Sequence, residues 1–172
     1  MEYFDVYDKH GKKQNKTVKR GTVLKPGEYV LIIHLWIQNT RGEFLIQKRA
    51  KEDDRKPYQW AITTGIAMTG ETALTAVIRE ADEELGIKLT PNQLQEIDKF
   101  ASKRNHFQTL TTMYLVKQDI DLSTLVLNPE EVSEVAWKSL DAIQSMIVDD
   151  TFWNYPFLMN VPDYFRRLEK SL

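Results

Sequence analysis

The chain has 172 residues, of which 42% are hydrophobic and 28% are charged, and its formal net charge is -2. This composition is typical of a globular domain, and no apolar run approaches the roughly 18 residues that a membrane span needs. The absence of cysteine excludes disulfides, thiolate metal sites and cysteine nucleophiles.

The near balance of 23 basic and 25 acidic residues gives no broad positive surface. We therefore expect neither nucleic acid nor a membrane as a partner. The first residues lack the basic and then apolar layout of a secretory signal, so we expect a cytoplasmic location. The length fits one domain, and the sequence has no internal repeat and no long Gly/Ser-rich linker, so we expect a single domain over residues 1–172.

Residues 1–27 are expected to form an N-terminal hairpin extension, with a strand at Tyr3–Tyr7, a Lys-rich turn and a second extended piece that ends near "KPGE". The core is expected to span residues 28–145. A C-terminal helical segment is expected at residues 146–172.

The core opens with two predicted strands, "EYVLIIHLWIQ" and "EFLIQKR", which are joined by a turn at "NTRG". The period of two places His34 and Trp36 on one face of the first strand, with Ile33 and Leu35 on the other. Both faces are apolar, which indicates a central strand covered on both sides.

A short strand within "WAITTGIAM" leads into a predicted amphipathic helix from Thr72 to Leu85, and Gly86 is expected to end it. The apolar residues of this helix recur at spacings of 3, 4, 7 and 11: Leu74, Val77, Ile78, Ala81 and Leu85.

The second half of the chain mixes strands and helices. After a helical turn at "TPNQL", strands are predicted within residues 97–102, 109–117 and 132–137. Helices are predicted at Leu140 to Val148 and Asp163 to Lys170, with an aromatic-rich connection, "FWNYPFLMNVP", between them. This order predicts an α/β or α+β fold with helices on both faces of a mixed sheet.

The predicted helix carries three acids, Glu80, Glu83 and Glu84, within one arc of about 100° away from its apolar stripe. Like charges at these spacings destabilise a bare helix. One interpretation is a solvated acidic face that Arg79 partly neutralises. The other is a site for a hard cation, because Mg²⁺ and Mn²⁺ prefer oxygen ligands and are often held together with substrate phosphates.

The spacing around these acids is specific. Gly65 is followed after five residues by Glu71, and after seven more by "READEELGI", residues 79–87. This arrangement resembles the Nudix box, G-x5-E-x7-R-E-U-x-E-E-x-G-U, in which U is an apolar residue. Every fixed position matches, and the small Ala81 at the first U is the one soft point. The resemblance covers about residues 28–145 and implies a Nudix-like α/β/α sandwich with a mixed β-sheet between helices.

The resemblance implies a metal-dependent pyrophosphohydrolase that uses Mg²⁺ or Mn²⁺. Such an enzyme cleaves a nucleoside diphosphate linked to another moiety X by water attack at phosphorus, and it releases a nucleoside monophosphate and phosphorylated X. Carried over by position, Glu83 and Glu84 are the principal metal ligands. Glu80 is a further ligand or the base for the water, and a backbone carbonyl near Thr64 or Gly65 is an extra ligand.

Glu71 and Arg79 are expected to hold the box loop to the helix, either as a purely structural ion pair or with a direct part in catalysis. Gly65 and Gly70 are expected to supply the unusual backbone angles of this loop.

Residues outside the box are candidates for the same site. Glu130, Glu131 and Glu134 lie in a later segment from which the family often takes another acid, and the sequence does not choose among them. For substrate binding the candidates are His34, Trp36, Gln47 and Arg49, with Trp36 stacking on a base and Arg49 holding phosphate. The aromatic segment 152–157 could form a homodimer interface or part of the core.

Two other functions are considered. The N-terminal portion also resembles the Nudix branch that contains isopentenyl-diphosphate isomerase, but Thr64 and Ile66 occupy the positions of that enzyme's catalytic cysteine and histidine. A non-catalytic nucleotide-binding module is the other alternative, and the complete box disfavours it. The base and the X group are not specified by the sequence.

Overall fold

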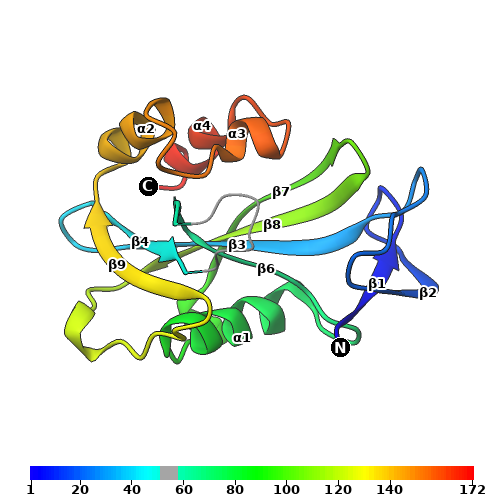
Figure 1. The fold of residues 1–172 in the computed structure, drawn as a ribbon, viewed down its shortest axis with the longest axis horizontal. Coiled ribbons are helices and arrows are strands. Elements are labelled where there is room, and N and C mark those ends of the chain that lie inside the picture. Colours follow the sequence, from blue (N-terminus) through cyan, green and yellow to red (C-terminus); the bar gives the residue numbers. More distant parts are fainter. Residues whose placement is uncertain (51–57) are drawn as a thin grey trace.

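The computed structural model describes residues 1–50 and 58–172 (Figure 1). A mixed sheet lies between a helix of the box on one face and three C-terminal helices on the other. The predicted α+β class with helices on both faces of a mixed sheet is confirmed. The helices are α1 (Ala73–Leu85), α2 (Leu140–Val148), α3 (Tyr155–Leu158) and α4 (Tyr164–Glu169).

The sheet splits between strands β3 (Val30–Gln38) and β4 (Phe44–Arg49), which pair at only one end. Its other members are β5 (Trp60–Ala61), β6 (Thr63–Ile66), β7 (Gln95–Arg104), β8 (Phe107–Lys117) and β9 (Val132–Lys138). Central β3 runs parallel to β8 and antiparallel to β6, but it pairs with β4 only at Gln38 and Phe44. Strand β4 instead pairs with β5 and β9. The two groups of strands therefore diverge, and polar side chains of β4 and β6 meet beside α1.

Each face of the sheet has its own hydrophobic core, as the apolar alternation of β3 predicts. Ile33, Leu35 and Ile37 pack against the apolar stripe of α1. Trp36 lies on the opposite face, under the C-terminal helices, in a cluster that includes Tyr164. Both cores are completed by segments more than 30 residues away in sequence, so neither the strand nor the helices are formed by local preference alone.

The aromatic segment 152–157 belongs mainly to this second core. Phe152 is completely buried and Tyr155 is 3% exposed, whereas Phe157 is 58% exposed. Helix α3, which was not predicted, begins inside this segment and is capped by Asn154. The segment therefore serves the core, and dimerisation stays a prediction.

The N-terminal hairpin consists of β1 (Tyr3–Tyr7) and β2 (Lys13–Lys19), as predicted. It has a small hydrophobic cluster of its own, which reaches the start of β3 at Val30. A backbone bridge between Tyr7 and Tyr29 fixes the hairpin to the main chain just before the sheet begins. Figure 1 shows the hairpin at the end of the molecule where the loop between β6 and α1 turns.

Helix α1 has the ends that its sequence predicts. Thr72 accepts a hydrogen bond from the backbone of Thr75, and the Thr75 side chain accepts one in return, which forms a capping box. Gly86 ends the helix in the left-handed conformation, with φ of 68°. Within the part of the chain that the structure describes, no helix is both long and apolar enough to cross a membrane.

Candidate active site

The acids of the box lie at the C-terminal end of α1. Glu80, Glu83 and Glu84 are all in its last two turns, where their negative charges add to the negative end of the helix dipole. Arg79 offsets part of this repulsion, since its Nη1 donates to Glu80 at 2.8 Å and to Glu83 at 3.0 Å. Burial alone would lower the pKa of Arg79, but its carboxylate partners raise it well above the ordinary value.

Arg79 also ties the helix to the preceding loop. Its Nε and Nη2 donate to the two oxygens of Glu71 at 2.7 and 2.9 Å, and Nη2 donates to the carbonyl of Ile66 at 3.3 Å. Glu71 accepts a further hydrogen bond from the backbone N–H of Met68 at 2.8 Å. Burial opposes ionisation of Glu71, but these donors outweigh it and lower its pKa. The side-chain contacts that the structure gives Glu71, the ion pair with Arg79 and the bond from Met68, thus hold the loop to the helix.

Glu80 is packed directly against Gly65. A Cβ atom at position 65 would overlap the Glu80 carboxyl group, so any larger residue there would displace this side chain. The prediction that Gly65 supplies an unusual backbone angle is wrong, because its φ is not positive. The prediction is right for Gly70, whose φ is 85°. Burial raises the pKa of Glu80 to about 7, while Arg79 lowers it and the charges of Glu83 and Glu131 raise it.

Glu84 faces the opening of the sheet and is held from β4. The Gln47 Nε2 donates to a Glu84 oxygen at 2.7 Å, and the Gln47 carbonyl oxygen accepts from the Thr63 hydroxyl of β6 at 2.9 Å. The hydroxyl thereby fixes which end of the amide faces the acid. Burial raises the pKa of Glu84 to about 8, and the nearby charges of Glu80 and Glu131 act in the same direction.

The late loop, residues 126–131, docks on the end of α1. The backbone N–H of Val126 donates to the carbonyl of Leu85 at 3.2 Å, and that of Asn128 donates to the carbonyl of Glu84 at 3.0 Å. These bonds satisfy carbonyls that a helix leaves unpaired at its C-terminus. The docking sets the position of the acids in this loop, Glu130 and Glu131.

Of the three late acids, Glu131 is the one whose charge acts on the box. It raises the pKa of both Glu80 and Glu84. Glu130 is exposed, and Glu134 is 57% exposed and pairs with Lys48 at 3.2 Å. The structure therefore brings Glu131, and neither of the other two, to the acidic end of α1.

Two of the four predicted substrate-binding residues lie in the hydrophobic core. Trp36 is completely buried, and its Nε1 donates to the Tyr164 hydroxyl at 3.2 Å. The same hydroxyl lies 2.7 Å from Nδ1 of His34, and burial lowers the pKa of His34 to about 3. The expectation that these side chains line the substrate pocket is wrong in this structure, because the C-terminal helices cover their face of β3.

Gln47 and Arg49 do reach the acidic side. The charge of Arg49 lowers the pKa of Glu84, and its guanidinium lies 4.7 Å from the ring centre of Trp153. Trp153 and Tyr155 were not predicted as site residues. The Tyr155 hydroxyl accepts from the backbone of Ile62 at 3.2 Å and lies close enough to Glu84 and Arg49 for their charges to affect its pKa. The aromatic-rich composition of this segment was the one signal in the sequence.

The carboxylates of Glu80, Glu83 and Glu84 have the chemistry of a hard-cation site, but their oxygens do not point toward one common position. In the described residues, no three His, Cys, Asp or Glu side chains are close enough to enclose a metal ion. The hydrogen bonds explain this, since Arg79 holds Glu80 and Glu83 while Gln47 holds Glu84. Oxygen donors whose pKa values rise through burial and mutual repulsion fit a divalent cation, because a cation would relieve both costs.

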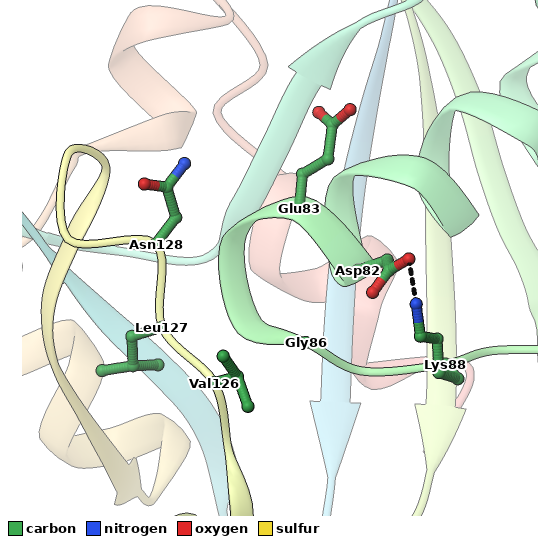
Figure 2. A pocket seen from close by; sticks show the side chains of 7 residues that line it. All are labelled: Asp82, Glu83, Gly86, Lys88, Val126, Leu127 and Asn128. Carbon is green, nitrogen blue, oxygen red and sulfur yellow. Dashed lines mark hydrogen bonds and ion pairs between the residues drawn. The ribbon is translucent and has the colours of Figure 1, made fainter.

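A shallow depression of about 360 Å³ lies beside this acidic face, where the last turn of α1 meets the late loop. Figure 2 shows the side chains that line it. Asp82 and Lys88 form an ion pair on one side of it at 2.5 Å, and Glu83 points away from that pair. Of the acids expected to bind the metal, only Glu83 is among the residues that line the depression. The depression therefore borders the candidate site and does not enclose it.

Comparison with known proteins identifies the family. The model of the NUDIX domain matches residues 29–161, which is most of the chain. The chain belongs to the Nudix hydrolase family. Members of this family act on pyrophosphate bonds.

This Nudix hydrolase is 33% identical over 160 residues to the Nudix hydrolase lin0387 of Listeria innocua, with 92% of each chain covered. It is also 29% identical over 157 residues to an isopentenyl-diphosphate delta-isomerase of Escherichia coli, which covers 82% of this chain and 80% of the isomerase. The predicted likeness to that branch is confirmed.

Solved structures confirm the fold of this Nudix hydrolase. DR0079 from Deinococcus radiodurans has a TM-score of 0.71 at 20% identity, over 88% of this chain and 91% of that one. The Nudix domain of NrtR from Shewanella oneidensis, crystallised with ADP-ribose, has a TM-score of 0.60 at 13% identity, over 87% and 94% of the two chains. At these identities the likeness concerns the fold alone.

Proposed function

We propose that this Nudix hydrolase is a metal-dependent pyrophosphohydrolase whose substrate is a nucleoside diphosphate linked to another moiety X. Water attacks a phosphorus atom of the diphosphate, the phosphoanhydride bond breaks, and a nucleoside monophosphate and phosphorylated X leave. The observation that carries this proposal is the placement of three half-buried acids, Glu80, Glu84 and Glu131, at the end of α1, where Gln47 holds Glu84, Arg79 holds Glu80 and the docked late loop brings Glu131 near enough for its charge to act on both.

Mg²⁺ or Mn²⁺ would be held by Glu83, Glu84 and Glu80, with the backbone carbonyl of Gly65 and the carboxylate of Glu131 as further ligands. When bound, the metal neutralises phosphoryl charge and activates water. This choice of Glu131 rests on the docking of the late loop against the carbonyls of Glu84 and Leu85.

The other residues act on the substrate or on these acids. Gln47 orients Glu84, and the Arg79 to Glu71 ion pair keeps the helix in register with its loop. Glu80 either serves as a ligand or accepts the proton of the attacking water. Arg49 is placed to contact a phosphate, since its guanidinium lies near Glu84 and is supported by the ring of Trp153.

A diphosphate that joins two ribosyl groups, as in ADP-ribose, is the first substrate to test. A Nudix domain of the same fold was crystallised with ADP-ribose. The cytoplasmic location and the homodimer are further proposals that rest on the sequence alone. An isomerase function is not proposed, because the chain contains no cysteine to transfer a proton at carbon.

A substrate panel tests the proposal. It contains ADP-ribose, dinucleoside polyphosphates, nucleotide sugars, coenzyme A and oxidised nucleoside triphosphates, each with Mg²⁺ and with Mn²⁺, and the product monophosphate identifies the base. Glu84→Gln is expected to reduce turnover by more than about 100-fold, which is the upper range for loss of a residue that only supports a ligand. Asp82→Asn is the matched control, because Asp82 lies on the same helix but pairs with Lys88.

Equal product release by the wild type and Glu84→Gln on every substrate would refute the hydrolase proposal. A non-catalytic binding module would instead show saturable nucleotide binding without turnover in either metal. Both results are separable from poor folding, since the thermal unfolding of each variant is measured alongside.

A further inference from the structure

The N-terminal hairpin contacts the box loop through a buried charge. The Asp5 side chain is 3% exposed, and one of its oxygens accepts a hydrogen bond from the backbone N–H of Gly70 at 2.8 Å. The Lys13 ammonium lies 2.7 Å from the same carboxylate oxygen. One residue before Gly70, the N–H of Thr69 donates to the carbonyl of Tyr3 at 2.8 Å. Two adjacent amides of the loop are therefore held by β1.

The direction of Asp5 follows from the strand. Phe4 and Val6 point into the small hydrophobic cluster of the hairpin, so Asp5, between them, points to the opposite side. Burial alone would raise the pKa of Asp5, but the Gly70 N–H and the Lys13 ammonium outweigh it and lower the pKa. A charged acceptor makes a stronger hydrogen bond than a neutral one, so this contact restrains the loop more than an ordinary turn bond does.

The restrained loop leads directly to the acids of α1. Glu71 follows Gly70 in the chain, and its carboxylate is shared between the Met68 N–H of the same loop and Arg79. Arg79 in turn holds Glu80 and Glu83. The contacts therefore run without a gap from the hairpin, through the loop and Arg79, to two of the proposed metal ligands.

We propose that Asp5, paired with Lys13, is a positioning residue that fixes the loop between β6 and α1 and thereby sets the geometry of the carboxylates on α1. This rests on the proposed function only in that the carboxylates are taken as metal ligands. The hairpin lies outside the matched NUDIX domain, which begins at residue 29, so it supplies the active site with a support from outside the domain.

The test compares metal binding with overall stability. Mn²⁺ alone, without substrate, is titrated calorimetrically into the full chain, and amide hydrogen exchange is followed over residues 66–72. Asp5→Ala is expected to weaken Mn²⁺ binding about tenfold and to speed exchange in this loop, as is typical when a group that orients metal ligands is removed. Asp5→Asn should restore most of the affinity, because its amide oxygen still accepts from Gly70.

Val18→Ala is the matched control. Val18 is 6% exposed in the same hairpin, but it packs in the hydrophobic cluster and not against the loop. It should lower the melting temperature while leaving the Mn²⁺ affinity within about twofold of the wild type. An equal loss of affinity in Val18→Ala and Asp5→Ala, or no loss in Asp5→Ala, would overturn the proposal.

If Asp5→Ala does not fold, Asp5→Asn and Lys13→Met decide the question. Asp5→Asn keeps an acceptor for Gly70 but loses its charge, and Lys13→Met leaves the buried carboxylate without its counter-ion. Each should bind Mn²⁺ somewhat less tightly than the wild type, and wild-type affinity in both would overturn the proposal. Failure of the hydrolase proposal is a separate result, since a wild type that binds Mn²⁺ but hydrolyses nothing leaves the positioning role intact.

Discussion

The two faces of the sheet bury polar groups in opposite ways. Under the C-terminal helices, His34, Trp36 and Tyr164 form a neutral network: Nε1 of Trp36 donates to the Tyr164 hydroxyl, and the same hydroxyl shares a hydrogen bond with Nδ1 of His34. Under α1, by contrast, Glu80 and Glu84 are buried close to other acids, and their pKa values rise to about 7 and 8.

The difference separates structure from function. The network on the helical side is satisfied by partners within the chain, so it stabilises the fold and needs no ligand. On the α1 side, the charges of Arg79 and Arg49 relieve part of the repulsion, but burial and the neighbouring acids still raise the pKa values of Glu80 and Glu84, so a further cation would lower the free energy of this group. Four substitutions test this contrast, from the largest expected effect to the smallest.

Trp36→Ala should have the largest effect, and on stability alone. Removal of a completely buried tryptophan leaves a cavity under α4 and is expected to cost about 3–5 kcal/mol in the free energy of unfolding, measured by urea denaturation. The Mn²⁺ affinity of the folded fraction should not change. A stable variant with a raised KM would instead support stacking of Trp36 on a base, and it would contradict a purely structural role for this face of the sheet.

Gln47→Met should act on the opposite face. The variant loses the N–H that orients Glu84, so the Mn²⁺ concentration for half-maximal activity should rise by about 10–100-fold. Gln108→Met is the matched control, because Gln108 is also buried but donates to the carbonyl of Lys25, away from the acids. Similar shifts in both variants would show that any buried glutamine has this effect.

Glu84→Gln should stabilise the metal-free protein at high pH. Because the folded pKa of Glu84, about 8, lies above the ordinary value of 4.5, the folded state binds more protons than the unfolded state between these values. Wild-type stability should therefore fall as pH rises through this window. The stability of the variant should depend less on pH, and its free energy of unfolding at pH 9 should exceed that of the wild type by about 1–2 kcal/mol.

The measurement is urea denaturation from pH 5 to pH 9 in the presence of a chelator. Parallel curves for the wild type and Glu84→Gln would contradict the raised pKa. With saturating Mn²⁺ the wild-type trend should reverse, because the metal binds the ionised carboxylate and is favoured at higher pH.

Asp82→Asn should have the smallest effect. Asp82 is 40% exposed and its partner Lys88 is 81% exposed, so loss of this ion pair should change the free energy of unfolding by less than about 0.5 kcal/mol. Turnover should be unchanged. A large loss of activity would place Asp82 with the box acids and contradict its assignment as a solvated charge.

Local signals in the sequence predicted α1 and its acids well. Thr72 and Gly86 cap the helix at the positions that their residue types indicate, and the spacing from Gly65 identified the box. The helix Leu140–Val148 was predicted with the bounds that the structure shows, and Ser139 caps its N-terminus.

The remaining features depend on contacts between distant parts of the chain. The alternation in β3 placed His34 and Trp36 on one face, but only the docking of Tyr164, 130 residues after His34, makes that face a core. The choice of Glu131 over its neighbours likewise depends on how the late loop docks on α1. Gly65 leaves room for the close approach of the Glu80 side chain, which a pattern of backbone preferences does not reveal.

The docking of the late loop limits how this enzyme can be redesigned. Glu84 uses its side chain toward β4 and its backbone carbonyl toward Asn128, so one residue joins the proposed chemistry to the loop. An insertion between Asn128 and Glu131 would displace the acid from this junction. A loop graft intended to change specificity should therefore end before Val126.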